Sequence, residues 1–268
     1  MDFMVVGEWT GIGLFKNKEG NFKNVAAEYG LDSKLGWWFS ITPTDINRDG
    51  KTDYVLGNLG LNSKYKASEK KPLFIYGHDI DKNGTYDQIL SYEYKGKKVP
   101  FRGRQCSSEQ VPFIKDKFPS YEAFANASLQ DVYGNELDNA VQKKATTFKS
   151  AILIQGNNGF DLIDLPTEAQ LRPILSGVSV DLDKNGYEDL ILVGNIFETE
   201  VETPRLDYKN ATVLLSDGKE YSYNAAYSSQ LSIEGNSKSI VLLDSDNQEA
   251  KILIGVNNEK LREFTIID

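Results

Sequence analysis

The stretch that decides the fold is residues 181–195, which read Asp181-Leu182-Asp183-Lys184-Asn185-Gly186-Tyr187-Glu188-Asp189-Leu190-Ile191-Leu192-Val193-Gly194-Asn195. An acidic loop that contains glycine is followed directly by a short apolar run, and the run is closed by Gly-Asn. Such a run, bounded by turn residues, predicts a buried strand that ends in a turn. Similar apolar runs closed by glycine recur at residues 3–8, 54–58 and 252–256.

Self-similarity of this kind is the signature of a repeat architecture. Further apolar runs precede the acidic loops at residues 38–41 and 174–180, and alternating runs follow at 12–15 and 211–215. A unit of strand, acidic loop, strand, strand, turn and strand corresponds to one four-stranded blade of a β-propeller. The sequence therefore predicts an all-β fold, a β-propeller of about five repeat units. Residues 1–268 are predicted to form this single domain.

The first predicted unit lacks its opening strand and the last lacks its closing strand. The two either complete one another, as in the strand closure of a propeller, or reflect sequence upstream of residue 1. An incomplete ring is therefore an open alternative.

One segment, about residues 100–147, breaks the repeat and predicts a helical insertion. Ser120, which follows Pro119, is a suitable helix N-cap, and Gly134 is a suitable helix stop. The strand pattern returns at residues 151–154.

Three loops share the spacing Asp-x-Asp/Asn-x-Asp/Asn-Gly-x-x-Asp, and each is predicted to stand at the same place within a repeat. Their side-chain oxygen donors are Asp45, Asn47, Asp49 and Asp53 in the first loop, Asp79, Asp81, Asn83 and Asp87 in the second, and Asp181, Asp183, Asn185 and Asp189 in the third. Donors at alternate positions converge on one point only where the loop curls, and the glycine permits that curl. The backbone carbonyls just after the glycine are expected to add a further oxygen, from Lys51, Thr85 and Tyr187.

An irregular cage of oxygen donors suits Ca²⁺ better than Mg²⁺ or softer metals, so the loops predict about three Ca²⁺ sites. An EF-hand is excluded because its twelfth loop position needs Glu, whereas these loops carry Leu56, Leu90 and Leu192. The alternative is that Asp, Asn and Gly simply favour turns.

The composition is that of a globular protein and excludes several classes of function. Of the 268 residues, 40% are hydrophobic and 26% charged, and the net charge is −9 at pH 7. Such a surface repels phosphate backbones, so no nucleic-acid partner is expected. The single cysteine, Cys106, excludes an intrachain disulfide, and the single histidine, His78, excludes a His-rich metal centre. No apolar run approaches the roughly 20 residues of a transmembrane helix.

The loops and strands together resemble FG-GAP/VCBS repeats, the integrin-α-like β-propeller family. A closer likeness, to the C-terminal repeats of large Bacteroidota surface proteins with VCBS repeats and an ASPIC/UnbV-type domain, is carried by residues 37–38, 57–68 and 200–203. The resemblance covers nearly the whole chain, although the chain has no ASPIC/UnbV segment and too few repeats for a full ring. It implies a calcium-binding propeller exported to the periplasm, the outer-membrane surface or the extracellular space, and it assigns the metal role to the twelve side-chain donors named above. It implies no catalytic activity.

Three functions remain open at this level. The leading one is a non-enzymatic module that engages a protein or glycan partner, supported by aromatic and polar stretches at residues 94–104 and 198–205. The second is an exported calcium-dependent carbohydrate-active enzyme, such as a polysaccharide lyase, with His78 as the base and Arg102 and Arg104 gripping a uronate. The third is a structural segment of a larger outer-membrane-associated assembly, in which calcium staples the turns.

Overall fold

The computed structural model describes residues 1–200, 202–245 and 248–266, with 39% strand and 17% helix. Val201, within the 200–203 motif, lies outside the described residues. The chain forms two compact units, the first from Met1–Lys64 with Phe148–Asp268 and the second from Tyr65–Thr147. That residues 1–268 act as a single domain stays a prediction.

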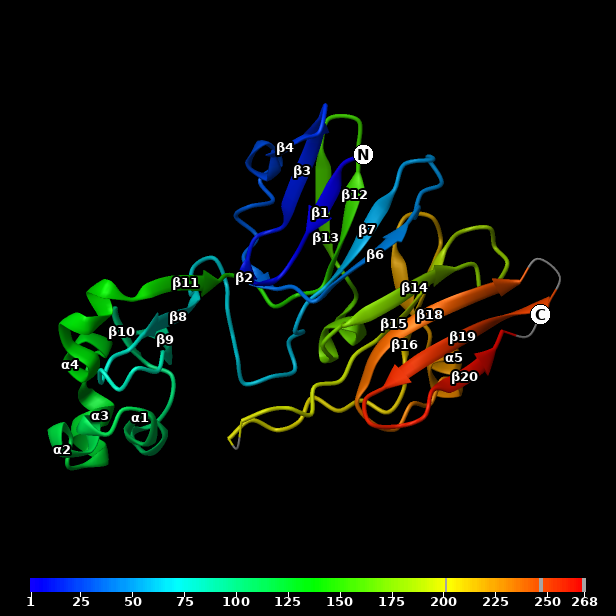
Figure 1. Cartoon of the computed structure of the whole chain (residues 1–268). Coiled ribbons are helices and arrows are strands. Elements are labelled where there is room, and N and C mark those ends of the chain that lie inside the picture. The colour runs from blue at the N-terminus through cyan, green and yellow to red at the C-terminus, as the bar shows by residue number, and fades with distance from the viewer. Residues whose placement is uncertain (201, 246–247, 267–268) are drawn as a thin grey trace. The chain divides into compact units, whose positions relative to one another are not determined.

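The first unit is built mainly from antiparallel sheets of three or four strands (Figure 1). The three-stranded sheet β1-β3-β4 contains β1 (Phe3–Val5), β3 (Gly13–Lys18) and β4 (Asn21–Asn24). The sheet β13-β12-β7-β6 contains β6 (Ser40–Thr44), β7 (Asp53–Gly57), β12 (Ala151–Gln155) and β13 (Phe160–Asp164). The sheet β14-β15-β16-β17 contains β14 (Ser176–Val180), β15 (Asp189–Val193), β16 (Thr212–Ser216) and β17 (Tyr221–Tyr223).

The remaining elements among the described residues of the first unit are a further three-stranded sheet, one strand pair and three short helices. The sheet β18-β19-β20 contains β18 (Ser237–Ser245), β19 (Gln248–Val256) and β20 (Arg262–Thr265). The pair contains β2 (Glu8–Thr10) and β5 (Gly36–Trp37). The helices are η1 (Ala26–Tyr29), η3 (Thr167–Leu171) and α5 (Ala225–Gln230).

Strand β15 is buried along its whole length, which explains its continuous apolar run. Leu190 and Leu192 pack in one core cluster with Val55 of β7, whereas Ile191 and Val193 pack in another with Ile254 of β19. Because successive side chains of a strand point to opposite faces, both faces of the sheet are covered by neighbouring sheets. The first strands of the three sheets lie side by side, β6 next to β14 and β14 next to β18.

The second unit contains one four-stranded sheet, β10-β9-β8-β11, and a group of short helices. The strands are β8 (Leu73–His78), β9 (Asp87–Tyr94), β10 (Lys97–Pro100) and β11 (Val141–Ala145). The helices are α1 (Arg104–Gln110), α2 (Phe113–Lys117), α3 (Tyr121–Asn126), α4 (Leu129–Tyr133) and η2 (Gly134–Asn139). They pack on the sheet through a core that joins Phe74, Tyr76 and Ile89 to Ile114 and Val132.

The helical segment is where the sequence predicts it, but it is broken into short pieces. Ser120 caps α3 by accepting a hydrogen bond from the amide of Ala123 at 3.1 Å. Ala127 then leaves helical geometry, and Ser128 opens α4 through a reciprocal capping box with Asp131. Gly134, with φ 69°, ends α4. A second strong cap inside the segment therefore begins a separate helix between Ser120 and Gly134.

The helices are only part of a larger insertion. The whole second unit stands in the chain between β7 and β12, which are neighbours in one sheet of the first unit. The second acidic loop joins β8 to β9 and belongs to this unit, whereas the first and third loops join β6 to β7 and β14 to β15. That each of the three loops stands at the same place within a repeat stays a prediction.

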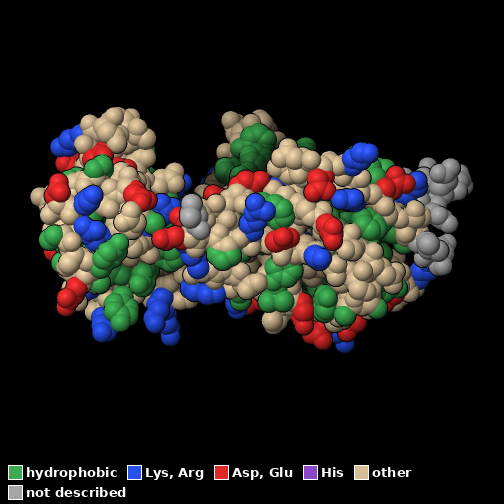
Figure 2. All heavy atoms as spheres, turned by 90° about the horizontal axis from the view of Figure 1, so that it is seen from below, with side chains coloured by type: hydrophobic (Ala, Val, Ile, Leu, Met, Phe, Trp, Pro, Cys, Tyr) green, Lys and Arg blue, Asp and Glu red, His purple; other side chains and the backbone are tan. Residues whose placement is uncertain are grey.

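The described residues contain no helix that is both long and apolar enough to cross a membrane. On the face seen in Figure 2, the acidic and basic side chains of the described residues are interspersed, so neither sign of charge dominates that face.

Candidate metal centre

The third acidic loop, in the hairpin between β14 and β15, brings the carboxylates of Asp181, Asp183 and Asp189 within 4.8 Å of one another. The curl that gathers them needs Gly186, whose φ of 92° is a backbone conformation that residues with a Cβ rarely adopt. The Gly186 amide donates to Asp181 Oδ2 at 2.9 Å and fixes the first carboxylate. Three carboxylates held this close form a group that could hold a metal ion.

The closing residue of this loop, Asp189, is completely buried. Its Oδ2 accepts a hydrogen bond from the Leu182 amide at 2.8 Å, and its Oδ1 accepts one from the Ser216 amide at 2.8 Å. Burial raises the pKa of the Asp189 carboxyl, and the two backbone amides oppose that shift. Asp189 thus ties its own loop to the third strand of the sheet.

Asp181 carries an oxygen that the protein leaves unsatisfied. Its Oδ1 is buried and has no hydrogen-bond partner among the described residues. An unsatisfied buried carboxylate oxygen is costly, and native proteins normally pair such atoms. A divalent cation between the three carboxylates would satisfy this atom, so the donor set fits a metal ion.

The second loop repeats this arrangement in the hairpin between β8 and β9. The carboxylates of Asp79, Asp81 and Asp87 lie within 4.8 Å of one another, and Gly84 has φ 88°. Asp87 is only 4% exposed, and its Oδ2 accepts from the Ile80 amide at 3.0 Å. The same spacing has therefore produced a second group that could hold a metal ion, in a different unit of the chain.

The first loop has the same backbone framework without the clustered carboxylates. Asp53 closes it as Asp189 closes the third loop, accepting from the amides of Ile46 at 3.2 Å and Gln155 at 2.8 Å. Among the described residues, however, Asp45, Asp49 and Asp53 do not form a group of the kind found in the other two loops.

The difference lies at the third position of the loop, which is Asn47 in the first loop but Asp81 and Asp183 in the other two, so the first loop has no carboxylate there. The first loop also differs in Lys51, whose ammonium nitrogen lies 3.3 Å from Asp49 Oδ2 and donates to Asn157 Oδ1 at 2.9 Å. The Lys51 amide donates to Asp49 Oδ1 at 2.9 Å, and this hydrogen bond is the main cause that lowers the pKa of the Asp49 carboxyl. The first loop therefore holds a cation of its own, on a lysine side chain.

The three loop asparagines shape the turns in the structure. The Oδ1 atoms of Asn47, Asn83 and Asn185 each accept from the amide two residues later, at 3.0, 2.7 and 2.8 Å. That these side chains, and the carbonyls of Lys51, Thr85 and Tyr187, bind a metal stays a prediction.

Glu188 joins the first and third loops, a role that the loop spacing does not reveal. Its Oε2 accepts hydrogen bonds from Ser179 Oγ at 2.7 Å, Thr44 Oγ1 at 3.0 Å and the Asp45 amide at 3.0 Å. The guanidinium of Arg48 lies 5.9 Å from the ring centroid of Tyr187. The two loops are therefore in contact across adjacent sheets. Glu188, which precedes the closing Asp189 of the third loop, positions Asp45, the first donor of the first loop.

The residues considered for a lyase make other contacts. His78 Nε2 lies 3.4 Å from Glu136 Oε2. Arg104 donates to the carbonyls of Phe118 at 2.5 Å and Lys115 at 3.2 Å, at the end of α2, while Cys106 is half-buried. Arg104 therefore stabilises the helical segment of the second unit.

No protein-family model matches the chain, and no curated protein matches it in sequence. The residues of the acidic loops therefore carry the functional argument.

Proposed function

We propose that the chain is a calcium-binding, non-enzymatic β-propeller-type module of the FG-GAP/VCBS kind, in which Ca²⁺ clips hairpins together. The observation that carries the proposal is the third loop, where three carboxylates converge and the buried Oδ1 of Asp181 has no partner. Hard oxygen donors on an irregular loop favour Ca²⁺ over the octahedral Mg²⁺. The second loop offers an equivalent set of carboxylates.

The propeller assignment is supported by the order of strands in the first unit. Two of its sheets have four antiparallel strands, and a buried second strand lies between the first and third in each. The first strands β6, β14 and β18 of three successive sheets are neighbours, as the inner strands of adjacent blades would be.

Export to the periplasm or cell surface and a protein or glycan partner belong to the same proposal. Calcium sites of extracellular modules work at about 10⁻⁴–10⁻³ M. A metal that binds only the folded chain stabilises it by mass action, which makes the module a rigid platform for a partner.

The test is thermal unfolding with excess Ca²⁺ and with EGTA, together with metal counting on the same sample. At a 100-fold excess of Ca²⁺ over its Kd we expect the melting temperature to rise by about 5–10 °C for each saturated site. Mg²⁺ at the same concentration should give a smaller shift.

The matched variants are Asp181→Asn and Asp161→Asn. Asp161 is exposed on β13 and lies outside the acidic loops, so its replacement should leave the calcium response unchanged. Asp181→Asn should remove one bound ion and part of the thermal shift. Equal melting curves in Ca²⁺ and EGTA, with no bound metal, would contradict the proposal.

A further inference from the structure

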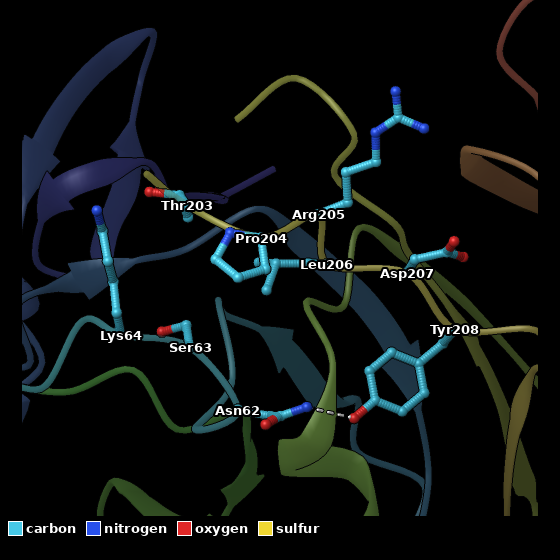
Figure 3. Close-up of a pocket in the computed structure, with 9 residues that line it drawn as sticks. All are labelled: Asn62, Ser63, Lys64, Thr203, Pro204, Arg205, Leu206, Asp207 and Tyr208. Atoms are coloured by element: carbon cyan, nitrogen blue, oxygen red, sulfur yellow. Dashed lines mark hydrogen bonds between the residues drawn. The ribbon is translucent and has the colours of Figure 1, made fainter. Parts of the chain in front are cut away.

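A pocket of about 390 Å³ lies in the first unit, away from the three acidic loops (Figure 3). It is lined by two loops, each of which follows the second strand of a four-stranded sheet. The lining residues are Asn62, Ser63, Lys64, Thr203, Pro204, Arg205, Leu206, Asp207 and Tyr208. Its volume falls in the range of small-molecule sites, roughly 300–1,000 Å³.

The second of these loops is long but firmly held. Between β15 and β16 the chain contains no regular strand or helix in its described residues, and loops of this length are usually functional. Ile196 and Leu206 pair as an antiparallel bridge, with both of their backbone hydrogen bonds at 2.9 Å. Buried Asn195 accepts from the Tyr208 amide at 3.0 Å and donates to the Tyr208 carbonyl at 2.9 Å, so the position of Tyr208 is fixed.

A buried arginine lies over the ring of Tyr208. Arg172 is 1% exposed, and its guanidinium lies 5.4 Å from the ring centroid of Tyr208. It donates to the carbonyls of Gly194 and Asn210, and no carboxylate among the described residues pairs with it. Even with burial, which lowers its pKa to about 10, Arg172 remains a cation at neutral pH.

The two loops are also tied to each other at the edge of the pocket. Lys64 Nζ lies 2.6 Å from Glu200 Oε1, and Thr203 Oγ1 donates to the same oxygen at 2.9 Å. The first loop is anchored underneath by the Gly60 amide, which donates to the Phe148 carbonyl at 2.8 Å. The pocket is therefore preorganised rather than formed by loose loops.

Two lining groups retain hydrogen-bonding capacity. Asn62 Nδ2 donates to the Tyr208 phenol oxygen at 2.8 Å, and Figure 3 shows these two groups pointing toward one another. In this arrangement Asn62 Oδ1 can still accept and the Tyr208 hydroxyl can still donate. In the same view Arg205 points away from the pair, and its guanidinium lies 4.9 Å from the ring centroid of Phe197.

We propose that this pocket binds a saccharide. Its polar side chains outnumber the apolar Pro204 and Leu206, which does not suit an apolar ligand. A sugar ring matches it, since the hydroxyls complement the Asn62–Tyr208 pair and the C–H face packs on the apolar side chains. A peptide that adds a strand is disfavoured, because the backbone groups of Ile196 and Leu206 already bond to each other.

The proposal names the partner of the module and so rests on the proposed function, but its test does not depend on calcium binding. Cellobiose, maltose, lactose, chitobiose and digalacturonate are titrated into the full chain, with and without Ca²⁺, and followed by ligand-observed saturation-transfer NMR. We expect at least one disaccharide to bind. Tyr208→Phe and Asn62→Ala should each weaken that binding by roughly 3- to 10-fold.

Tyr223→Phe is the matched control, because Tyr223 is exposed on β17 and lies outside the pocket lining. It should leave binding unchanged, and all variants should keep the wild-type calcium response. Absence of binding by every disaccharide, or binding insensitive to both pocket variants, would overturn the proposal. Binding of acetyl-tetra-alanine-amide in place of the sugars would overturn the saccharide class. A missing calcium response with intact sugar binding would count against the metal proposal alone.

Discussion

The first and third acidic loops have the same spacing and the same place in a hairpin, yet they differ in charge arrangement. Asp53 and Asp189 are both fully buried and both bond to two backbone amides. Of these two loops only the third gathers three carboxylates, because its third position is Asp183 whereas the first loop has Asn47 there. The shared spacing therefore sets the backbone of such a loop, and the residue at its third position decides how many carboxylates the loop gathers.

The largest effect is expected from removing a closing aspartate. Asp189→Ala leaves the buried amides of Leu182 and Ser216 without acceptors, which should lower the free energy of unfolding by about 3 kcal/mol in EGTA. Asp53→Ala should cost a similar amount, since it frees the amides of Ile46 and Gln155. Urea unfolding in EGTA measures both.

The contrast between these two variants lies in their response to calcium. Asp189→Ala should also lose one bound ion, whereas Asp53→Ala should change the metal count little. Equal loss of calcium from both variants would mean that the two loops bind metal alike and would break the comparison.

The next effect concerns the lysine of the first loop. Lys51→Thr places at this position the residue that the second loop has at Thr85, and it removes the ammonium beside Asp49. We expect the calcium affinity of the first loop to rise by about tenfold, the change given by one charge interaction of roughly 1.4 kcal/mol. Calorimetric titration measures it, with Lys51→Arg as the variant that keeps the charge. If Lys51→Thr and Lys51→Arg gave the same binding curve, the charge of Lys51 would not influence calcium binding by the first loop.

A smaller effect is expected from the link between the loops. Glu188→Gln weakens three hydrogen bonds accepted by Oε2, so the unfolding free energy should fall by about 1 kcal/mol. A double-mutant cycle with Thr44→Val should show that the two losses do not add. Strict additivity would show that Glu188 and Thr44 act independently.

The smallest effect is on the pH dependence of the calcium response. Burial raises the pKa of Asp189, so in calcium-free protein its contribution to stability is present at low pH and is lost as pH rises through that raised pKa. Calcium needs the ionised carboxylate, so the difference in melting temperature between Ca²⁺ and EGTA should grow from about pH 4 to pH 7. A difference that stays constant over this range would contradict the role of Asp189 as a ligand.

The sequence predicts much of the local structure correctly. The apolar runs at residues 54–57 and 190–193 fall within β7 and β15, and the acidic stretches before them form the expected turns. Ser120 and Gly134 mark a helix start and a helix end as predicted. These features are short-range, because they depend on glycine, on side-chain caps and on the alternation of apolar residues within a few positions.

The sequence does not reveal the second unit or the link through Glu188. Strand β11, within residues predicted to be helical, pairs with β8 from far earlier in the chain. Glu188 accepts hydrogen bonds from Thr44 and Asp45 of the neighbouring hairpin, although it stands at an x position of the loop spacing, where any residue is allowed. Such pairings depend on which sheets become neighbours, and no local pattern encodes that.

By itself, the sequence determined the mostly β fold, the hairpins and the oxygen-rich character of the three loops, because each follows from the chemistry of adjacent residues. The tertiary structure alone decided that β7 and β12 pair although the second unit lies between them in the chain, and that the pocket beside Tyr208 is built from two distant loops. It also decided that the carboxylates of Asp181, Asp183 and Asp189 converge, since convergence depends on the burial of Asp189 and on the curl of the loop.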